Sequence, residues 1–303
     1  MKLKFLIFFI AVAYSQLLSQ KEATVSKITQ EINLDGALDE EVWNSSKPAD
    51  NFWQYFPSDT SLAENQSEIY FLYDESNLYV GIKCFSTGND FVIPSLKRDF
   101  RAGGNDNMTL LIDPFNDRIN AFMFGTNPAG VQREGLISGG GNDITQFATS
   151  WDNKWKCEAK IFDDYWSAEM AIPLSILRFK PGIDKWGFNA YRFDIQTNER
   201  STWSKIPLNQ IIFNLAFNGE LQWDKAPVST KGGGNALIPY VTAGRSKNFE
   251  SDTDPKVSFN VGGDAKIAIT PSLNLDLTFN PDFSQVEVDQ QVTNVDRFEI
   301  FFP

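Results

Sequence analysis

The stretch LLIDPFNDRINAFMFGTNPAGVQREG, from Leu110 to Gly135, is typical of a β-hairpin. The apolar runs Leu110 to Ile112 and Ala121 to Phe124 predict its two strands. The segment DPFNDRIN between them is rich in Asp, Asn and Pro, which favour turns. Its charged side chains permit two interpretations: they satisfy the backbone of their own loop, or they form a ligand site.

The same pattern of short alternating runs, separated by Gly, Asn, Asp and Pro, extends over most of the chain and predicts an all-β fold. The one exception is PLSILRF, Pro173 to Phe179, which predicts a single short helix because proline suits the first helical position. Seven or more short strands favour a β-sandwich. Further strands are predicted at Ile69 to Tyr73, Leu78 to Cys84, Met108 to Ile112, Ala121 to Thr126, Trp155 to Ile161, Trp166 to Ile172 and Trp186 to Phe193.

The composition excludes several classes of function. The 303 residues contain no histidine, so Ser-His-Asp and Cys-His catalysis are excluded and zinc or haem ligation is disfavoured. A formal net charge of -12 disfavours nucleic acid as a partner. The carboxylates remain as candidate catalytic groups, but 39 Asp and Glu residues are too many to single out a pair.

The N-terminal residues 1–20 have the layout of a secretory signal peptide. Lys2 and Lys4 precede the apolar run Phe5 to Ala13, and small and polar residues follow. The run is too short to span a bilayer as a helix. We therefore expect an exported protein, located in the periplasm or at the outer membrane of the cell.

The composition changes at STKGGGN, Ser229 to Asn235, which is typical of a linker. Beyond it, Val257 to Ile269 and Leu273 to Phe279 alternate almost perfectly between apolar and polar residues. Strands with one apolar and one polar face are typical of outer-membrane barrels, although an ordinary hairpin with one wet face has the same pattern. A closed barrel needs at least about eight strands, so we expect only the first strands of one here.

Several longer motifs resemble a known domain arrangement. ITQEINLDGALDEEVWNSS (28–46), YFLYDESNLYVGIKCF (70–85) and WSAEMAIPLSILRF (166–179) resemble a carbohydrate-binding module family 9-like domain, a sandwich of the jelly-roll or DOMON-like kind. The final segment NPDFSQVEVDQQVTNVDRFEIFFP (280–303) resembles the start of the DUF5916 outer-membrane barrel domain of exported Bacteroidetes proteins. The resemblance implies a signal peptide at 1–20, a sandwich at 21–228, a linker at 229–236 and a barrel fragment at 237–303.

This resemblance implies noncatalytic binding of a glycan by a cell-envelope protein, in support of polysaccharide breakdown or uptake. Two alternatives stay open. The related modules occur with glycoside hydrolases, which would use paired carboxylates, and the sandwich could instead be a structural, docking or plug domain of the barrel. Because family members continue well past the final FFP, the resemblance also implies that this chain is a truncated copy.

Sugar binding needs flat aromatic faces and a few fixed polar groups. Strand phase and the opening motif assign four of the eight tryptophans to the core: Trp43, Trp155, Trp166 and Trp186. Four aromatic residues outside clear strand phase are therefore candidates for stacking on a sugar ring: Trp53, Tyr55, Trp151 and Trp203.

Polar candidates fall in two groups. Arg98 and Asp99, in a Gly-rich loop, could bind vicinal hydroxyls of a sugar or form a local ion pair. Three aspartates could hold a structural Ca²⁺, although their spacing matches no twelve-residue calcium loop: Asp106, Asp113 and Asp117. The two cysteines, Cys84 and Cys157, both fall in the inward phase of a strand, where a disulfide and two buried thiols fit equally well.

Overall fold

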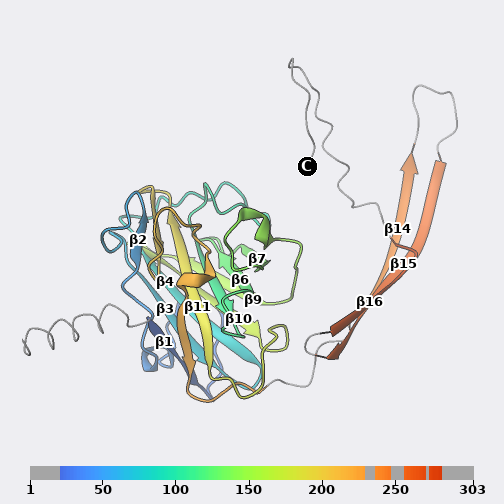
Figure 1. Cartoon of the computed structure of the whole chain (residues 1–303). Helices are drawn as coiled ribbons and strands as arrows, with labels where there is room; N and C mark the ends of the chain where they lie inside the picture. The colour runs from blue at the N-terminus through green and yellow to red at the C-terminus, as the bar shows by residue number, and fades with distance from the viewer. Residues whose placement is uncertain (1–20, 229–235, 247–255, 271–272, 282–303) are drawn as a thin grey trace, which may run out of the picture. The chain divides into compact units, whose positions relative to one another are not determined.

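The structure is a computed structural model that describes residues 21–228, 236–246, 256–270 and 273–281. It contains two compact units, Met1–Gly232 and Gly233–Pro303 (Figure 1). The predicted signal peptide and the predicted linker, Ser229 to Asn235, lie outside the described residues. Each unit is described separately below.

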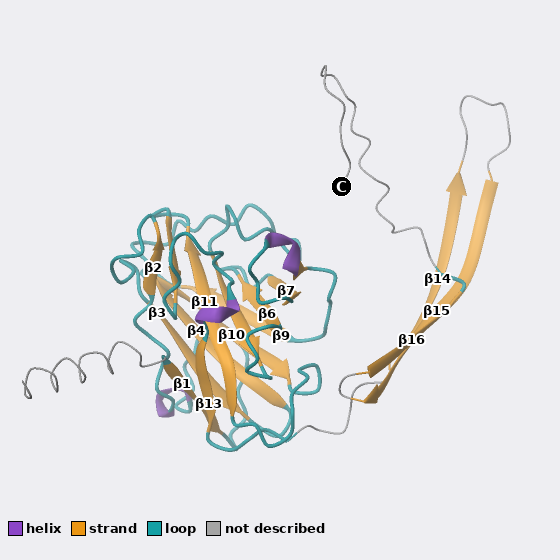
Figure 2. Ribbon diagram, in the orientation of Figure 1, coloured by secondary structure: helices purple, strands orange, loops and turns teal. Residues whose placement is uncertain are grey.

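The first unit is built from thirteen strands and three short 3-10 helices (Figure 2). The all-β prediction is confirmed, and every predicted strand of this unit is present to within a few residues. The strands are β1 (Glu22–Lys27), β2 (Trp53–Phe56), β3 (Ser67–Tyr73), β4 (Asn77–Phe85), β5 (Asn107–Asp113), β6 (Ala121–Thr126), β7 (Gln132–Ile137), β8 (Phe147–Ala148), β9 (Lys156–Ile161), β10 (Tyr165–Pro173), β11 (Lys185–Asp194), β12 (Glu199–Thr202) and β13 (Gly219–Trp223). The 3-10 helices are η1 (Trp43–Ser45), η2 (Ile144–Gln146) and η3 (Leu215–Phe217).

The predicted helix at Pro173 to Phe179 is wrong. Pro173 is the last residue of β10, and only two single-turn hydrogen bonds follow, from Ile176 N–H to Pro173 C=O and from Leu177 N–H to Leu174 C=O. Leu174 and Leu177 are buried in the core. The helix-like spacing of Leu174 and Leu177 therefore arises from a turn that places both side chains in the core, and not from a helix.

The strands form two layers that share their first strand. The order is β8-β7-β6-β5-β11-β13 in one layer and β3-β4-β10-β9 in the other, and β1 pairs in parallel with both β13 and β3. The ribbon of β2 and β12 extends from β11. This arrangement confirms the predicted sandwich, whose two layers join at β1 and whose free edge strands, β8 and β9, are the two ends of the strand order.

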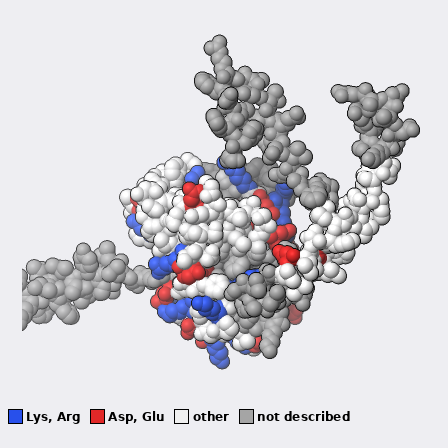
Figure 3. Space-filling model, turned by 45° about the vertical axis from the view of Figure 1, so that its right-hand side comes forward, with Lys and Arg blue, Asp and Glu red and all other residues white. Residues whose placement is uncertain are grey.

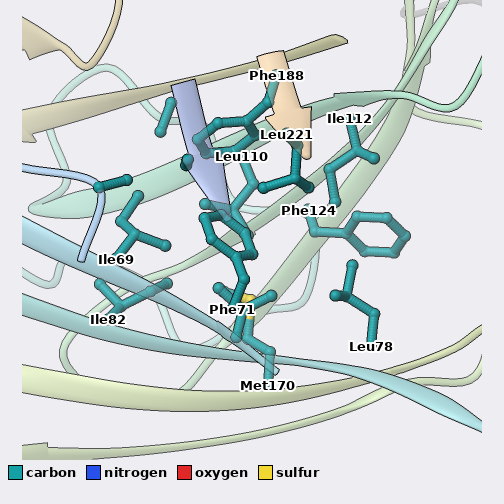
Figure 4. Packing of buried hydrophobic residues seen from close by; sticks show 14 of the residues in the cluster. Ile69, Phe71, Leu78, Ile82, Leu110, Ile112, Phe124, Met170, Phe188 and Leu221 are labelled. Carbon is teal, nitrogen blue, oxygen red and sulfur yellow. The ribbon is translucent and has the colours of Figure 1, made fainter. Parts of the chain in front are cut away.

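The main core lies between the layers (Figure 4). Phe71 of β3 and Phe188 of β11, one from each layer, meet edge to face with ring centroids 4.9 Å apart. The tryptophans predicted to be core residues, Trp43, Trp155, Trp166 and Trp186, are all buried. Strand phase and the opening motif therefore assigned these four tryptophans correctly.

Loops also cover the outer faces of both layers. Residues of the 213–215 loop bury the outer side of β5, β6 and β11, and the segment from Ile28 to Trp43 packs on β3. The buried carboxylate of Glu169 on β10 holds this segment by accepting hydrogen bonds from the backbone N–H groups of Asp35 and Gly36 and from Trp43 Nε1. At Gly36, which has φ of 81°, a Cβ atom would lie 2.7 Å from the backbone of Ala159. The motif LDGALDEEVW thus closes over the sheet.

Both cysteines are free thiols. Cys84 is buried on β4, and Cys157 is partly buried on β9. Cys84 lies opposite Trp166 and Cys157 lies opposite Met170 on the intervening strand β10, so the strand pairing keeps them apart. Burial raises the pKa of Cys84 to about 11.

The second unit is an antiparallel sheet of β14 (Ala236–Ser246), β15 (Lys256–Thr270) and β16 (Leu273–Phe279). The register places Val261 opposite Val241, and Ala265 between Leu237 and Leu277. Directly paired residues point to the same side of a sheet, so these side chains form one apolar face. Phe259 on this face is 67% exposed. We call this surface the apolar face of β14–β16.

The opposite face carries Thr242, Asn260, Asp264 and Thr278, together with Ile238. The two faces predicted from the sequence are therefore the two faces of the sheet. Figure 3 shows charged side chains of both signs over the sandwich, whereas the described residues of the second unit are mostly uncharged. None of the helices among the described residues is long and apolar enough to cross a membrane.

Candidate functional site

The free edges of the two layers are joined by side-chain contacts. Gln132 at the start of β7 donates a hydrogen bond from Nε2 to the C=O of Trp155, at 2.8 Å, beside the start of β9. Thr126 of β6 and Cys157 of β9 are in contact through Oγ1 and Sγ at 3.3 Å. The first residues of β9 are thereby held against the β6–β7 turn.

A groove of about 1150 Å³ lies along this junction. Its lining comes from four parts of the sandwich, brought together because β9 and the β6–β7 turn meet there. The lining segments are Glu31 to Leu34, Leu96 with Arg98, Ala129 to Gln132, and Trp155 to Glu158. The volume is slightly larger than that of typical small-molecule pockets, and the lining mixes apolar and polar groups.

Arg98 is the best-fixed cation in the groove. Its guanidinium forms an ion pair with the buried carboxylate of Glu134 on β7 and a second one with Asp152 at 3.1 Å. Glu134 also accepts hydrogen bonds from Trp155 Nε1 and from the N–H of Asn153. Burial raises the pKa of Glu134, and Arg98 opposes that rise. The Nη1 group of Arg98 has no hydrogen-bond partner among the described residues, so it is available to a ligand.

Trp151 precedes Asp152, which pairs with Arg98, but Trp151 itself does not line the groove. Its ring packs against Phe122 at 5.2 Å and Phe124 at 5.8 Å between centroids. The side chain is only partly buried, so part of the indole surface faces solvent. Of the predicted site residues, Arg98 lines the groove, and Trp151 is the sequence neighbour of its partner Asp152.

Two of the predicted stacking residues cannot stack on a sugar ring. Trp203 is 0% exposed, because its ring packs against Phe188 in the core. Tyr55 is buried, and its hydroxyl donates a hydrogen bond to the C=O of Gln210. Trp53 is partly exposed on β2, with the ammonium of Lys205 4.6 Å from its ring centroid, and it stays a prediction.

Asp99 organises backbone rather than presenting a free carboxylate. Its Oδ1 accepts a hydrogen bond from the N–H of Glu134, and its own N–H donates to the C=O of Gln132. Its φ of 58° lies in the left-handed region, which Asp tolerates better than most residues. Asp99 therefore supports the position of Arg98.

The predicted calcium site is wrong. Asp106 precedes β5 and Asp113 ends it, so the strand separates them by roughly 20 Å. Asp106 accepts hydrogen bonds from the N–H groups of Val92 and Ile195 instead. Within the described ranges, no group of three or more Asp, Glu, His or Cys residues could hold a metal ion.

The loop between β5 and β6 satisfies its own backbone. Asp113 accepts hydrogen bonds from the N–H groups of Phe115 and Arg118, and Asp117 accepts from those of Ile119 and Asn120. The first of the two interpretations of this hairpin is therefore supported. Burial raises the pKa of Asp113 to about 6, since its carboxylate is shielded from water.

Sequence reasoning missed two parts of the groove. One is Glu134, because nothing in the sequence indicates that Arg98, Asn153 and Trp155 converge on it. The segment from Glu31 to Leu34 belongs to the opening motif and gives no signal of a groove. Both contributions depend on long-range packing against β9, which no local pattern encodes.

Comparisons with known proteins address both units. Residues 235–303 match the family model described as a domain of unknown function, DUF5916. The sandwich is similar to a putative carbohydrate-binding protein from Bacteroides uniformis, with 17% identity, a TM-score of 0.53, and coverage of 68% of this chain and 100% of that one. No curated protein matches the sequence.

Two further solved structures are carbohydrate-binding module family 9 domains from Caldicellulosiruptor kristjanssonii. The one in complex with cellotriose has 16% identity and a TM-score of 0.44, and it covers 67% of this chain and 93% of that one. The one in complex with glucose has 15% identity and a TM-score of 0.44, with coverage of 70% and 100%. The predicted arrangement, a sandwich with a fold similar to that of a putative carbohydrate-binding protein followed by a segment that matches DUF5916, is confirmed.

Proposed function

We propose that the sandwich binds a glycan, without cleaving it, in the groove beside β9. The observation that carries this proposal is that the fixed guanidinium of Arg98 lines that groove and pairs with Asp152, the neighbour of the partly exposed Trp151. A partly exposed indole supplies an apolar face for a sugar ring, and the free Nη1 of a fixed guanidinium donates to hydroxyl or ring oxygens. The fold shared with a putative carbohydrate-binding protein agrees with this assignment.

The groove favours binding over hydrolysis. Glycoside hydrolysis needs one carboxyl group as an acid and a second as a base or nucleophile. The carboxylate of Glu134 is unsuited to either role, since Arg98, Asn153 and Trp155 all donate hydrogen bonds to it. Two other carboxylates, those of Glu31 and Glu158, line the groove, so the hydrolase alternative has a specific test.

The test is a glycan array followed by calorimetry on the purified chain, with Trp151→Ala and Trp53→Ala beside the parent. Trp53 is the matched control, because it is the other partly exposed candidate tryptophan and lies under Lys205 instead of beside Arg98. We expect Trp151→Ala to weaken binding by about tenfold or more and Trp53→Ala to leave it unchanged. Binding that depends on Trp53 alone, or no binding by the folded parent, would overturn the groove assignment.

The same samples test the enzyme alternative. We expect the bound oligosaccharide to be recovered intact after prolonged incubation. Release of shorter sugars that Glu158→Gln abolishes would show that the groove is a hydrolase site instead.

We further propose that the second unit contacts the hydrocarbon region of a membrane, and that the chain acts at the outer membrane after export. The apolar face of β14–β16 supports this, because three strands in register present apolar side chains there. Lipid is the solvent in which such a face needs no protein cover. Flotation of the chain with lipid vesicles tests the proposal, and Phe259→Asp should abolish flotation. Equal flotation of parent and variant would contradict it.

A further inference from the structure

A second surface of the sandwich gathers aromatic rings that the proposed groove does not use. On the outer face of the layer that contains β4, β10 and β9, Phe85 lies opposite Tyr165 in register, with ring centroids 6.2 Å apart. Phe162 stacks on Tyr165 at 4.4 Å with an angle of 13° between the ring planes. All three side chains are partly exposed. We call these three residues the aromatic platform.

Two lysines flank the platform. Lys83 and Lys160 lie in one row across the sheet, on either side of Ser167. The ammonium of Lys83 lies 4.3 Å from the ring centroid of Tyr165 and 5.0 Å from that of Phe85, and Lys160 lies 5.6 Å from Phe162. Each cation is therefore held over an aromatic ring.

Neither lysine is paired with a carboxylate among the described residues, although the chain has a net charge of -12. By contrast, Lys27 and Lys185 each form an ion pair, with Glu75 and Glu220. Glu68, which lies opposite Lys83 in register, instead accepts a hydrogen bond from Tyr70. The two ammonium groups are thus left without an anionic partner beside a flat aromatic surface.

We propose that this platform, with Lys83 and Lys160, is a binding site for an acidic polysaccharide. A sugar ring would pack its apolar face on the aromatic rings, and a carboxylate or sulfate on that ring would draw an ammonium group away from its aromatic neighbour. The exchange is favourable because a charge-assisted hydrogen bond is stronger than an exposed cation-π contact. None of the platform residues or the two lysines lines the groove, so the site is separate from the one proposed above.

The acidic neighbours of the platform explain why a polymer of sugars, and not a simple polyanion, fits it. Asp163 and Asp164 lie in the turn between β9 and β10, next to Phe162 and Tyr165, and both are exposed. Their charge repels a dense row of phosphates or a strongly anionic surface. A polysaccharide presents isolated anionic groups between neutral, hydroxylated faces, which suits two separated cations around stacked rings.

The test measures binding of the full chain to polygalacturonate, dextran sulfate and neutral dextran by affinity electrophoresis at two salt concentrations. The first two polymers distinguish a carboxylate from a sulfate as the recognised group, and dextran controls for a neutral chain. The variants are Lys83→Gln with Lys160→Gln, and separately Phe162→Leu. The matched charge control is Lys47→Gln with Lys180→Gln, two exposed lysines outside the platform.

We expect the Lys83/Lys160 double variant to lose about tenfold or more in affinity for at least one acidic polymer, since each removed contact is a hydrogen bond to a charged group. Phe162→Leu should weaken the same binding, and the control double variant should stay within about twofold of the parent. Melting curves followed by circular dichroism establish that each variant is folded.

Three outcomes would overturn the proposal. The first is an equal loss of affinity in the platform and control double variants, which indicates nonspecific charge attraction. The second is that the parent binds neither acidic polymer. The third is that binding is lost in Trp151→Ala but kept in the platform variants. The last outcome would move the acidic ligand to the groove and leave the proposed glycan function intact. If instead the groove variants bind glycan normally and the platform variants lose the acidic polymer, the platform proposal stands and the groove assignment falls.

Discussion

The sandwich and the three-stranded sheet follow the same alternation of apolar and polar residues, yet they treat the apolar side in opposite ways. In the sandwich, Phe71 and Phe188 from the two layers bury each other completely. In the second unit, Val257, Phe259 and Val261 stay more than half exposed. Alternation therefore specifies which residues share a face, but it does not specify what covers that face.

Cover in the sandwich comes from residues far away in the sequence. The outer side of β3 is covered by the segment around Trp43, which Glu169 on β10 anchors from 126 positions further along the chain. The outer side of β6 is covered by residues such as Phe213. A strand whose sequence alternates between apolar and polar residues can thus be buried on both faces.

The largest expected difference between the two units is in the effect of replacing one phenylalanine of each by alanine. Phe188→Ala should lower the free energy of unfolding by about 3 to 5 kcal/mol, because it leaves a cavity between the layers. Phe259→Ala should change it by less than about 0.5 kcal/mol, because that ring is exposed. Urea unfolding followed by tryptophan fluorescence gives the value for Phe188→Ala, since all eight tryptophans lie in the first unit, and far-UV circular dichroism of the full chain gives the value for Phe259→Ala. Similar losses of unfolding free energy in the two variants would show that both rings are buried to the same extent.

A smaller loss is expected where a loop is held down by a buried carboxylate. Glu169→Ala leaves three N–H donors, from Asp35, Gly36 and Trp43, without their acceptor and should cost about 2 to 3 kcal/mol. Glu158, directly opposite on β9, is exposed, so Glu158→Ala is the matched control and should change stability by less than about 0.5 kcal/mol. Hydrogen exchange should show lost protection of residues 28–46 only in the Glu169 variant.

The pH dependence of the stability of the sandwich tests the buried carboxyl group of Asp113, the last residue of β5. The pKa of Asp113 is about 6 in the folded chain, above its ordinary value of 3.8, so the folded state binds the proton more tightly. Its contribution to stability is therefore complete below about pH 4 and is lost as the pH rises to about 6, a fall of about 2 to 3 kcal/mol. Asp113→Asn should remove that segment of the stability curve. A variant curve parallel to that of the parent between pH 4 and 7 would show that the carboxyl titrates normally.

The smallest effect on unfolding is expected on the apolar face of β14–β16. Val261→Asn should leave the tryptophan-detected unfolding of the sandwich within about 0.5 kcal/mol of the parent, yet it should reduce self-association in detergent-free buffer. Asn260→Val, one residue earlier and on the opposite face, should not reduce it. Sedimentation velocity measures both, and equal behaviour of the two variants would show that the face has no special role.

The hairpin of β5 and β6 shows what sequence could establish. Leu110, Ile112 and Phe124 fall in one phase and enter the core together, and the Asp and Asn residues between the strands make the turn. Strand phase equally predicted that Trp166 and Trp186 are buried. These features are local, because period and turn chemistry are set by neighbouring residues.

The candidate site was less predictable, because it depends on which distant segments meet. Trp203 follows β12 outside any strand phase, so nothing local indicated that the ring would pack on Phe188. Asp106 and Asp113 are close in sequence, but an extended strand carries them apart. Arg98 and Trp151 were predicted as separate candidates, and only the pairing of Arg98 with Asp152 brings the neighbour of Trp151 to the residue that lines the groove.

The parallel pairing of β1 with both β13 and β3 has a consequence for how the chain folds. Glu22 lies opposite Glu220, so the first strand of the sandwich pairs with the last, almost 200 residues later. Such a contact closes a very long loop, and the entropy of closing it opposes early formation of the pair. We expect β1 to pair with β3 first and the pairing of β1 with β13 to form last, because residues 219–223 are the last strand of the sandwich to be synthesised. The slowest step in refolding should therefore be the one that protects the amides of β13.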